Sequence, residues 1–444
     1  MKDMFPKIAP GVLIRPIDGD YHYTVNCTQR DSLRILTALQ RAFLGSLNDG
    51  TSVAEFAERH AISVENSQML FESFVKSGIL LEREDLTCVR KPEFPTALDF
   101  WIHTTNACNL GCSYCYISTL HTSGGMSDEV KSRFLEKLVE TVEKRNITKI
   151  RLRLAGGEPL TQFKSWQHFI PNARQLLGNC SCNLEISFLT NLTLLTDEII
   201  DFAKKEHISF SVSIDGLKED HNRARPYLSG RGSFATIARN IRKLLENGLQ
   251  VSINTVVTNN NLYGLPALTD YLIGLDIPFR LSIVKGDKID GAALEQSLSI
   301  CFDKMAAAVQ KGWTVSGKFQ FCDLKPRELG FQTCSSGFSG GAINVDGTFN
   351  YCHVHFGDSV QQDISIYNND LDLVTMIEQG PHLEEIKSND CKACPYRAVC
   401  TSGCPVYRVG GKDPQCSIYH KFIPRIYDLH ALERLHLLQL HGII

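Results

Sequence analysis

The segment Cys108-Asn-Leu-Gly-Cys-Ser-Tyr-Cys-Tyr116 places three cysteines, Cys108, Cys112 and Cys115, in the spacing Cys-x3-Cys-x2-Cys. Three thiolates on one short loop can hold three irons of a cubane [4Fe–4S] cluster, and the fourth iron can then bind a small molecule. The same spacing is compatible with a zinc site that lacks one ligand, or with a disulfide and one spare thiol. By itself, the spacing indicates a metal or redox centre without fixing which one.

A second motif follows about one βα unit later. The strand-like run Ile150–Ala155 leads into Gly156-Gly157-Glu158-Pro159. Paired glycines let a backbone approach a ligand closely, and a glutamate can take up an ammonium group. Alone this motif is weak, because Gly-Gly turns before proline are common, but together with the cysteine loop it is strong.

The two motifs together resemble the radical S-adenosylmethionine (SAM) superfamily, and the resemblance covers the chain from about Leu98 onward. It implies that SAM chelates the open iron of the Cys108, Cys112 and Cys115 cluster. The resemblance places Tyr114, Gly156, Gly157, Glu158 and Pro159 around the bound SAM. Reductive cleavage of SAM would then give a 5′-deoxyadenosyl radical that abstracts a substrate hydrogen.

Composition bounds the class of protein. The chain has 444 residues, enough for two or three domains, and its 46 basic and 49 acidic side chains nearly cancel. This balance gives no bulk electrostatic attraction to nucleic acid or to a membrane. No apolar run approaches membrane-spanning length, and the first residues lack the apolar core of a secretion signal. Sixteen cysteines in such a chain indicate metal or redox ligands, so we expect a cytoplasmic iron–sulfur protein.

Residues 1–88 predict a separate α+β domain with a winged-helix-like shape. We expect a hairpin across Asp18-Gly19, helices over 31–47, 52–60 and 63–76, and a last strand over 79–82. The last helix has two acidic residues and one lysine, a poor surface for phosphates. The pattern is similar to PqqD-like leader-peptide-binding domains, called RiPP recognition elements. That resemblance implies that a leader peptide adds as a strand to the hairpin edge, whereas a generic accessory domain is the alternative.

Residues 96–300 alternate strands and helices, which predicts a partial (β/α)6 TIM-like barrel with its chemistry at the carboxyl ends of the strands. The strands are expected over 98–103, 150–155, 184–189, 208–214, 251–257 and 279–283. The helices are expected over 128–144, 164–177, 197–205, 234–246 and 265–273.

Further polar residues stand at the ends of the third and fourth predicted strands. By resemblance, SAM contacts are expected from Thr190, Asn191, Ser213, Asp215 and Arg225. Ser213 and Asp215 could bond the ribose hydroxyls, and Arg225 could pair with the SAM carboxylate. Ordinary turn chemistry is the alternative, since Asn and Asp-Gly occur in turns of any protein.

The last third of the chain carries seven more spaced cysteines, which resemble the SPASM domain of radical SAM enzymes. We expect this domain over 334–424, after a linker over 301–333 and before a C-terminal helix within 425–444. The resemblance implies two auxiliary [4Fe–4S] clusters: one on Cys334, Cys352 and Cys404, with Cys322 as the candidate fourth ligand, and one on Cys391, Cys394, Cys400 and Cys416. A zinc site is the alternative for the four-cysteine run. The remaining cysteines, Cys27, Cys88, Cys180, Cys182 and Cys301, fit no motif, and His353 and His355 are expected on the surface.

The three parts predict a radical SAM oxidoreductase that binds a ribosomal precursor peptide through its leader. It would form an intramolecular thioether or C–C cross-link in the core peptide. The expected cofactors are SAM and three [4Fe–4S] clusters, and the expected partner is an electron donor such as flavodoxin or ferredoxin, with no nucleic acid or membrane. Two alternatives stay open: sulfatase-maturase-like oxidation of a Cys or Ser in a partner protein, and an iron–sulfur scaffold or electron carrier. For the latter, Gly156–Pro159 and the polar strand ends would have no purpose.

Overall fold

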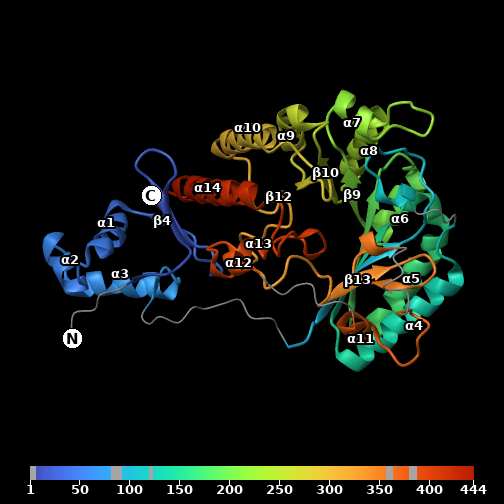
Figure 1. Ribbon diagram of the computed structural model, residues 1–444, viewed down its shortest axis with the longest axis horizontal. Helices are drawn as coiled ribbons and strands as arrows, with labels where there is room; N and C mark the ends of the chain where they lie inside the picture. Colours follow the sequence, from blue (N-terminus) through green and yellow to red (C-terminus); the bar gives the residue numbers. More distant parts are fainter. Residues whose placement is uncertain (1–6, 82–92, 120–123, 357–363, 380–387) are drawn as a thin grey trace. The chain divides into compact units, whose positions relative to one another are not determined.

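The computed structural model describes residues 7–81, 93–119, 124–356, 364–379 and 388–444 (Figure 1). The chain divides into two compact units. The first comprises Met1–Lys91, Leu298–Thr333 and Glu385–Ile444, and the second comprises Pro92–Ser297 and Cys334–Glu384. Cys88 and the end of the predicted strand over 79–82 lie outside the described residues. No helix in the described parts of the chain is long and apolar enough to cross a membrane.

The second unit is built on a largely parallel sheet whose strands run in the order β11-β10-β9-β8-β7-β6-β13-β14. The strands are β6 (Ala97–His103), β7 (Lys149–Ala155), β8 (Asn183–Thr190), β9 (Ser209–Ser213), β10 (Val251–Val257), β11 (Phe279–Ile283), β13 (Gly340–Ile343) and β14 (Phe349–Asn350). Strands β6 to β11 are parallel to one another, β13 is parallel to β6, and β14 is antiparallel to β13. All six predicted strands are confirmed, with ends within one residue of the predicted ones.

Helices cover one face of this sheet, and alternation along each strand explains why. In β6, Leu98, Phe100 and Ile102 are buried. The Phe100 ring packs edge-on against the Phe134 ring of helix α4 (Asp128–Arg145), with ring centroids 6.1 Å apart. The helices are α4 (Asp128–Arg145), α5 (Phe163–Asn179), α6 (Asp197–Lys205), α7 (Lys218–Ala224), α8 (Phe234–Glu246) and α9 (Leu265–Leu275) (Figure 1). The side chains of Ser127 and Thr196 cap the N-termini of α4 and α6. The sequence missed α7, whose Asp, His and Asn residues favour turns and whose first turn has no side-chain cap.

The other face of the sheet is polar. The guanidinium of Arg153 donates to Asp99 over 2.7 Å, and that of Arg151 donates to Glu185 over 3.0 Å. These side chains lie at alternating positions of neighbouring strands, so charged groups line this face. A face covered by helices would instead be apolar. The second unit also contains α11 (Leu373–Glu378), where Asp372 caps the helix and pairs with Arg145 at 2.8 Å.

The N-terminal part of the first unit contains the predicted hairpin. Its elements are β1 (Lys7–Ile8), β2 (Val12–Pro16), β3 (His22–Asn26), β4 (Arg34–Leu36), α1 (Ala38–Ser46), α2 (Val53–Arg59), α3 (Val64–Lys76) and β5 (Leu80–Leu81). Strands β2, β3 and β4 form an antiparallel sheet, and β1 pairs with β5. The predicted helix over 31–47 was wrong at its start. Asp31 is left-handed at φ 53°, β4 follows it, and a capping box between Thr37 and Gln40 starts the helix only at Ala38.

The rest of the first unit is organised by a long C-terminal helix, α14 (Cys416–Leu440), with β12 (Phe319–Phe321), α12 (Asn389–Ala393) and α13 (Arg397–Cys400). The sequence placed this helix within 425–444, but it begins at Cys416 and continues through Pro424. Asp428 of α14 accepts hydrogen bonds from Arg15 at 2.8 and 2.9 Å and from the buried Tyr23 hydroxyl at 2.9 Å. The N-terminal hairpin is therefore anchored to α14 by a shared carboxylate. A further long helix, α10, spans Gly291–Gln310.

Candidate functional site

The predicted strand-end motifs lie at one edge of the parallel sheet. The cysteine loop follows β6, Gly156–Pro159 follows β7, and Thr190 and Asn191 end β8. Ser213 ends β9, with Asp215 two residues beyond it. Since these strands are parallel neighbours, their carboxyl ends meet, and the side chains interact as described below.

The three cysteines of the loop are partly buried and close enough to influence one another. Burial raises the pKa of Cys108, and raises that of Cys112 to about 11; the charge of Cys115 adds to both shifts. Asn191 Nδ2 lies 3.8 Å from Cys108 Sγ, and Arg225 donates from Nη1 to Cys112 Sγ over 3.6 Å. The loop therefore holds thiols that need compensating positive charge to ionise, and Arg225 supplies some of it.

Asp215 is fully buried, and its carboxylate is committed to protein partners. Oδ2 accepts from Arg225 Nε over 2.6 Å and from the Tyr114 hydroxyl, while Oδ1 accepts from the Val256 N–H over 2.9 Å. The guanidinium also lies over the Tyr114 ring at 5.2 Å. Although burial opposes the charged form, the Asp215 carboxylate raises the pKa of Arg225. The arrangement fixes Arg225 and Tyr114 beside the cysteine loop.

Glu158 plays a comparable part between β7 and β8. It is fully buried and accepts from the Thr190 hydroxyl at 2.6 Å, the Leu160 N–H at 3.0 Å and the Asn191 N–H at 2.7 Å. Burial raises the pKa of Glu158 to about 7, and the bonds from Thr190 and Asn191 oppose that rise. The Asn191 side chain in turn donates to Asn109 Oδ1 over 3.0 Å, which links this strand end to the cysteine loop.

Gly156 and Gly157 allow their backbone to lie close to the backbone that precedes the cysteine loop. Gly156 has φ 129°, and a Cβ there would lie 2.5 Å from the carbonyl oxygen of Thr105. A Cβ on Gly157 would lie 2.2 Å from the carbonyl oxygen of Ala107. The Gly157 N–H donates to Thr105 O over 2.6 Å. From the sequence, these glycines were expected to let the backbone approach a ligand. In the structure they permit a close contact with the backbone that leads into the cysteine loop.

The remaining predicted residues of this edge are less engaged. The Ser213 side chain is half-buried, and no described residue bonds its hydroxyl. Pro159 is buried and begins the short helix η3 (Pro159–Gln162), where a proline needs no N–H partner. His221 and Asn261 were not predicted. The Asp215 N–H lies 3.4 Å from His221 Nδ1, and Asn261 Nδ2 donates to Asp215 O over 2.6 Å. A buried His or Asn carries no periodic signal that would have marked it in the sequence.

His353 was expected on the surface, and the structure places it partly there, with a half-buried side chain. It lies in η5 (His353–His355), and its ring stacks on Trp101 of β6 with centroids 4.0 Å apart and planes 25° apart. The Tyr116 ring is 5.2 Å away. Burial lowers the pKa of His353 to about 3, so the ring is neutral at physiological pH.

The cysteines of the first unit include a second group. Burial raises the pKa of Cys400, and the charges of Cys416, Cys394 and Cys391 add to the shift, so these four thiols lie within electrostatic reach of one another. The Tyr396 N–H donates to Cys394 Sγ over 3.4 Å. Cys322 and Cys404 lie in the first unit and Cys334 and Cys352 in the second, so that grouping stays a prediction. Within the described ranges, no three His, Cys, Asp or Glu side chains are placed to hold a single metal ion.

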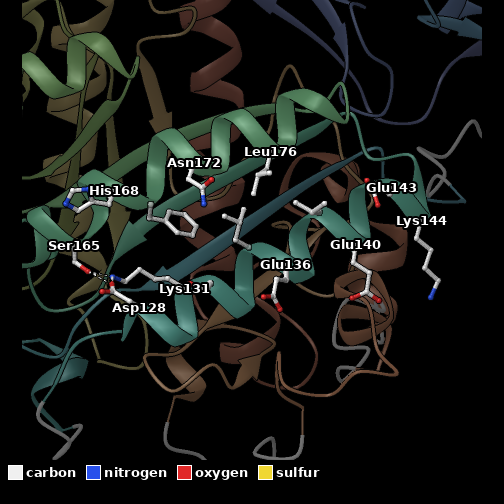
Figure 2. Close-up of a pocket in the computed structure, with 14 residues that line it drawn as sticks. Asp128, Lys131, Glu136, Glu140, Glu143, Lys144, Ser165, His168, Asn172 and Leu176 are labelled. Atoms are coloured by element: carbon white, nitrogen blue, oxygen red, sulfur yellow. Dashed lines mark hydrogen bonds and ion pairs between the residues drawn. The ribbon is translucent and has the colours of Figure 1, made fainter.

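A groove of about 1140 Å³ lies on the helix side of the sheet, between α4 and α5 (Figure 2). Its walls include Glu136 and Glu140 of α4 and Asn172 and Leu176 of α5. At one end, Lys131 contacts Asp128 at 2.5 Å and also the Ser165 hydroxyl. None of the predicted cluster cysteines lines this groove, so it is separate from the strand-end site.

Comparison with known proteins agrees with the strand-end geometry. Residues 102–270 match the sequence model of the Radical SAM superfamily. An uncharacterized protein of Methanocaldococcus jannaschii is 30% identical over 40% of this chain, and the chain spans 58% of that protein's length. The radical SAM cyclopropyl synthase TigE of Paramaledivibacter caminithermalis is 21% identical over 74% of this chain and 71% of its own. A cysteine-type anaerobic sulfatase-maturating enzyme of Clostridium novyi is 26% identical, covering 67% of this chain and 84% of its own.

Two solved structures share the fold. The structure of anSMEcpe with bound AdoMet superposes with a TM-score of 0.62 at 21% identity, covering 74% of this chain and 97% of that one. Streptococcus suis SuiB bound to its precursor peptide SuiA has a TM-score of 0.53 at 15% identity, covering 90% of this chain and 95% of that one. The chain therefore contains a radical SAM domain over residues 102–270, and its relatives include a radical SAM cyclopropyl synthase and a sulfatase-maturating enzyme.

Proposed function

We propose that this chain is a radical SAM oxidoreductase that modifies a ribosomal precursor peptide held by its leader. The proposal is carried by the meeting of the cysteine loop, Gly156–Pro159 and the Asp215–Arg225 pair at one edge of a parallel sheet. An iron–sulfur scaffold or electron carrier would have no use for this polar set, which disfavours that alternative.

Cys108, Cys112 and Cys115 would hold a [4Fe–4S] cluster, and the donor set fits such a group. Three thiols stand on one loop, and N–H groups of Asn191 and Arg225 face their sulfur atoms. Donors of this kind favour thiolates and orient the ligands. With SAM bound, a reduced cluster supplies the 5′-deoxyadenosyl radical that removes a substrate hydrogen.

The contacts divide the predicted SAM residues into two groups. We assign Glu158 to the SAM ammonium, since Oε2 has one protein donor and can accept another, and Ser213 to a ribose hydroxyl. Asp215 and Thr190 are positioning residues, because their side chains are bonded to Arg225 and Glu158. Arg225, fixed by Asp215 and facing Cys112, would keep a positive charge beside the cluster and the SAM carboxylate.

We propose two auxiliary [4Fe–4S] clusters in a SPASM domain. Cys391, Cys394, Cys400 and Cys416 would hold one, supported by their mutual electrostatic influence. The other would take Cys334, Cys352 and Cys404, with Cys322 as the candidate fourth ligand. Either cluster could accept the electron that leaves the substrate when the cross-link closes.

The leader would bind the N-terminal sheet by strand addition. Within the described residues, β2 and β4 each pair on one side only, both with β3. An edge of this kind offers unpaired backbone groups to an extended peptide. The anchor of Arg15 and Tyr23 on Asp428 would hold this sheet against α14, so a bound leader has a fixed tether.

The reaction proposed is closure of a thioether or C–C bond in the core peptide. One hydrogen atom passes to the adenosyl radical, and bond formation releases one proton and one electron. A donor such as flavodoxin or ferredoxin would supply the electron that cleaves SAM. We place this chemistry in the cytoplasm, where thiols and the clusters that they bind are kept reduced.

A second candidate is oxidation of a Cys or Ser in a partner protein, favoured by the sequence similarity to a cysteine-type sulfatase-maturating enzyme. The test uses the full-length reconstituted enzyme and any short, leader-bearing peptide that is found to be encoded beside its gene. We expect the labelled leader to bind at micromolar concentration by fluorescence polarisation, and mass spectrometry to detect a loss of two hydrogens from the whole peptide but little from a leaderless one. No leader binding, with turnover of a sulfatase peptide, would favour the maturase.

A further inference from the structure

Two unpaired polar atoms lie at the end of β6 on the face away from the helices. Trp101 and His103 alternate with Phe100, which packs on α4, so both project to the polar face. Trp101 Nε1 and His103 Nδ1 are buried, and neither has a hydrogen-bond partner among the described residues. His103 is 0% exposed. An unpaired buried polar atom costs roughly 1–3 kcal/mol, so two at one place point to a ligand.

The two atoms have complementary chemistry. An indole N–H can only donate a hydrogen bond. His103 Nε2 lies 2.6 Å from Asn106 Oδ1, an acceptor, so Nε2 carries the proton and Nδ1 is left as an acceptor. Burial lowers the pKa of His103, which keeps the ring neutral. The pair thus offers one donor and one acceptor, as a peptide group requires.

The spacing of the pair suits an extended chain. Positions i and i+2 of a strand lie about 7 Å apart on one face, which is also the repeat of any extended peptide. A peptide lying along the end of β6 could therefore present a carbonyl to Trp101 and an N–H to His103. Such contacts read the main chain and leave the side chains of the ligand free.

Stacking fixes the donor and places it beside the cysteine loop. The His353 ring covers the indole at 4.0 Å, so the direction of Nε1–H is set before a ligand arrives. Tyr116, whose ring is 5.2 Å from that of His353, directly follows Cys115. The unpaired atoms are thus near the loop where the hydrogen abstraction is proposed.

We propose that Trp101 Nε1–H and His103 Nδ1 bind the main chain of the core peptide and hold it extended beside the SAM site. The inference rests on the proposed function and adds how the substrate is positioned. It assigns the site to a peptide backbone, so residues of different side chains can occupy it.

The test compares Trp101→Phe, which removes the donor but keeps a ring, with His103→Gln, which keeps a donor toward Asn106 and removes the ring acceptor. In the full-length reconstituted enzyme, with the precursor peptide that the wild type modifies, we expect each change to raise KM about ten-fold, with kcat within about two-fold. Trp166→Phe is the matched control. Its Nε1 is also buried and unpartnered, but Trp166 lies in α5 on the helix side, so KM should not change.

Unchanged KM values in both variants would overturn the inference. So would a shifted electron paramagnetic resonance spectrum of the clusters without a KM change, since the nitrogen atoms would then face a cluster. If the wild-type enzyme does not modify the peptide at all, the proposed function fails together with this inference. Wild-type turnover combined with unchanged KM overturns the inference alone.

Discussion

Arg225 donates from Nε to Oδ2 of Asp215 over 2.6 Å, and both side chains are almost wholly withdrawn from water. The same guanidinium donates to Cys112 Sγ over 3.6 Å. The buried Asp215 carboxylate thus fixes the position of the positively charged guanidinium beside Cys112. Removing one partner of such a pair leaves an uncompensated buried charge.

Asp215→Asn should therefore destabilise the chain by roughly 3–5 kcal/mol and reduce 5′-deoxyadenosine formation, because Arg225 loses its partner. Chemical denaturation measures the first effect and chromatography the second. The matched control is Asp197→Asn, whose pair with Lys243 at 2.9 Å is exposed and should be worth at most about 1 kcal/mol. Equal effects of the two changes would show that Asp215 has no special role.

Gly157→Ala should displace the cysteine loop, because the new Cβ would meet the carbonyl oxygen of Ala107 at 2.2 Å. We expect lost 5′-deoxyadenosine and about four fewer irons per chain after reconstitution. Gly178→Ala is the control. Nothing lies within 4 Å of that Cβ, and alanine in a helix should stabilise by about 0.5–1 kcal/mol. Full cluster loading in Gly157→Ala would contradict the packing assigned to this glycine.

Glu158 should give stability a pH dependence of unusual sign for a carboxylate. Its pKa is raised from 4.5 to about 7 by burial, so between these values the folded chain holds a proton that the unfolded chain has lost. Stability from this group is therefore full below about pH 4.5 and declines by roughly 3 kcal/mol as pH rises through 7. The difference in unfolding free energy between wild type and Glu158→Gln, measured at pH 5 and pH 8, should shrink by about that amount.

His221→Gln supplies the opposite slope as an internal control. Burial lowers the pKa of His221 from 6.5 to about 4, so the unfolded chain binds the extra proton between these values. The stability contributed by His221 is present above about pH 6.5 and is lost as pH falls through 4. If both variants changed the pH profile in the same direction, the charge states assigned to these two groups would be wrong.

Iron content tests the three-cluster proposal. Anaerobic reconstitution should load about twelve irons per chain, four for each cubane. Replacing Cys391, Cys394, Cys400 and Cys416 together by alanine should leave about eight, with 5′-deoxyadenosine still formed. Replacing Cys182, a buried thiol outside every predicted set, should change nothing. A wild-type value near four, with bound zinc, would favour the zinc alternative.

The sequence predicted the elements around the site better than the contacts within it. Strands β6 to β11 have apolar residues at alternating positions, and this period located the strands. Ser127 and Thr196 are N-cap residues, which mark where α4 and α6 begin. Left-handed Asp31 and the continuation of α14 through Pro424 depend on tertiary packing, and local rules failed there. The stacking of His353 depends on the Trp101 ring of β6, more than two hundred residues earlier, which no local pattern encodes. For the same reason, the glycines of Gly156–Pro159 were recognised but their contact partner was not.

Asp428 should link peptide delivery to the hairpin that is proposed to hold the leader. Its carboxylate accepts two bonds from Arg15 and one from the buried Tyr23 hydroxyl, so Asp428→Ala leaves that hydroxyl without its short bond. We expect a loss of about 2 kcal/mol in stability and a looser tether for the leader.

A loose tether lowers the effective concentration of the core peptide at the reacting cluster, whereas SAM cleavage without peptide needs no tether. Product from the leader-bearing peptide should therefore fall several-fold in Asp428→Ala, while peptide-independent 5′-deoxyadenosine stays near the wild-type level. Asp303→Asn is the control. It removes a pair with Arg425 in which Asp303 is 72% exposed, and product formation should not change. If Asp428→Ala forms product at the wild-type rate, the anchor on α14 has no part in substrate delivery, and the hairpin would have to hold the leader without it.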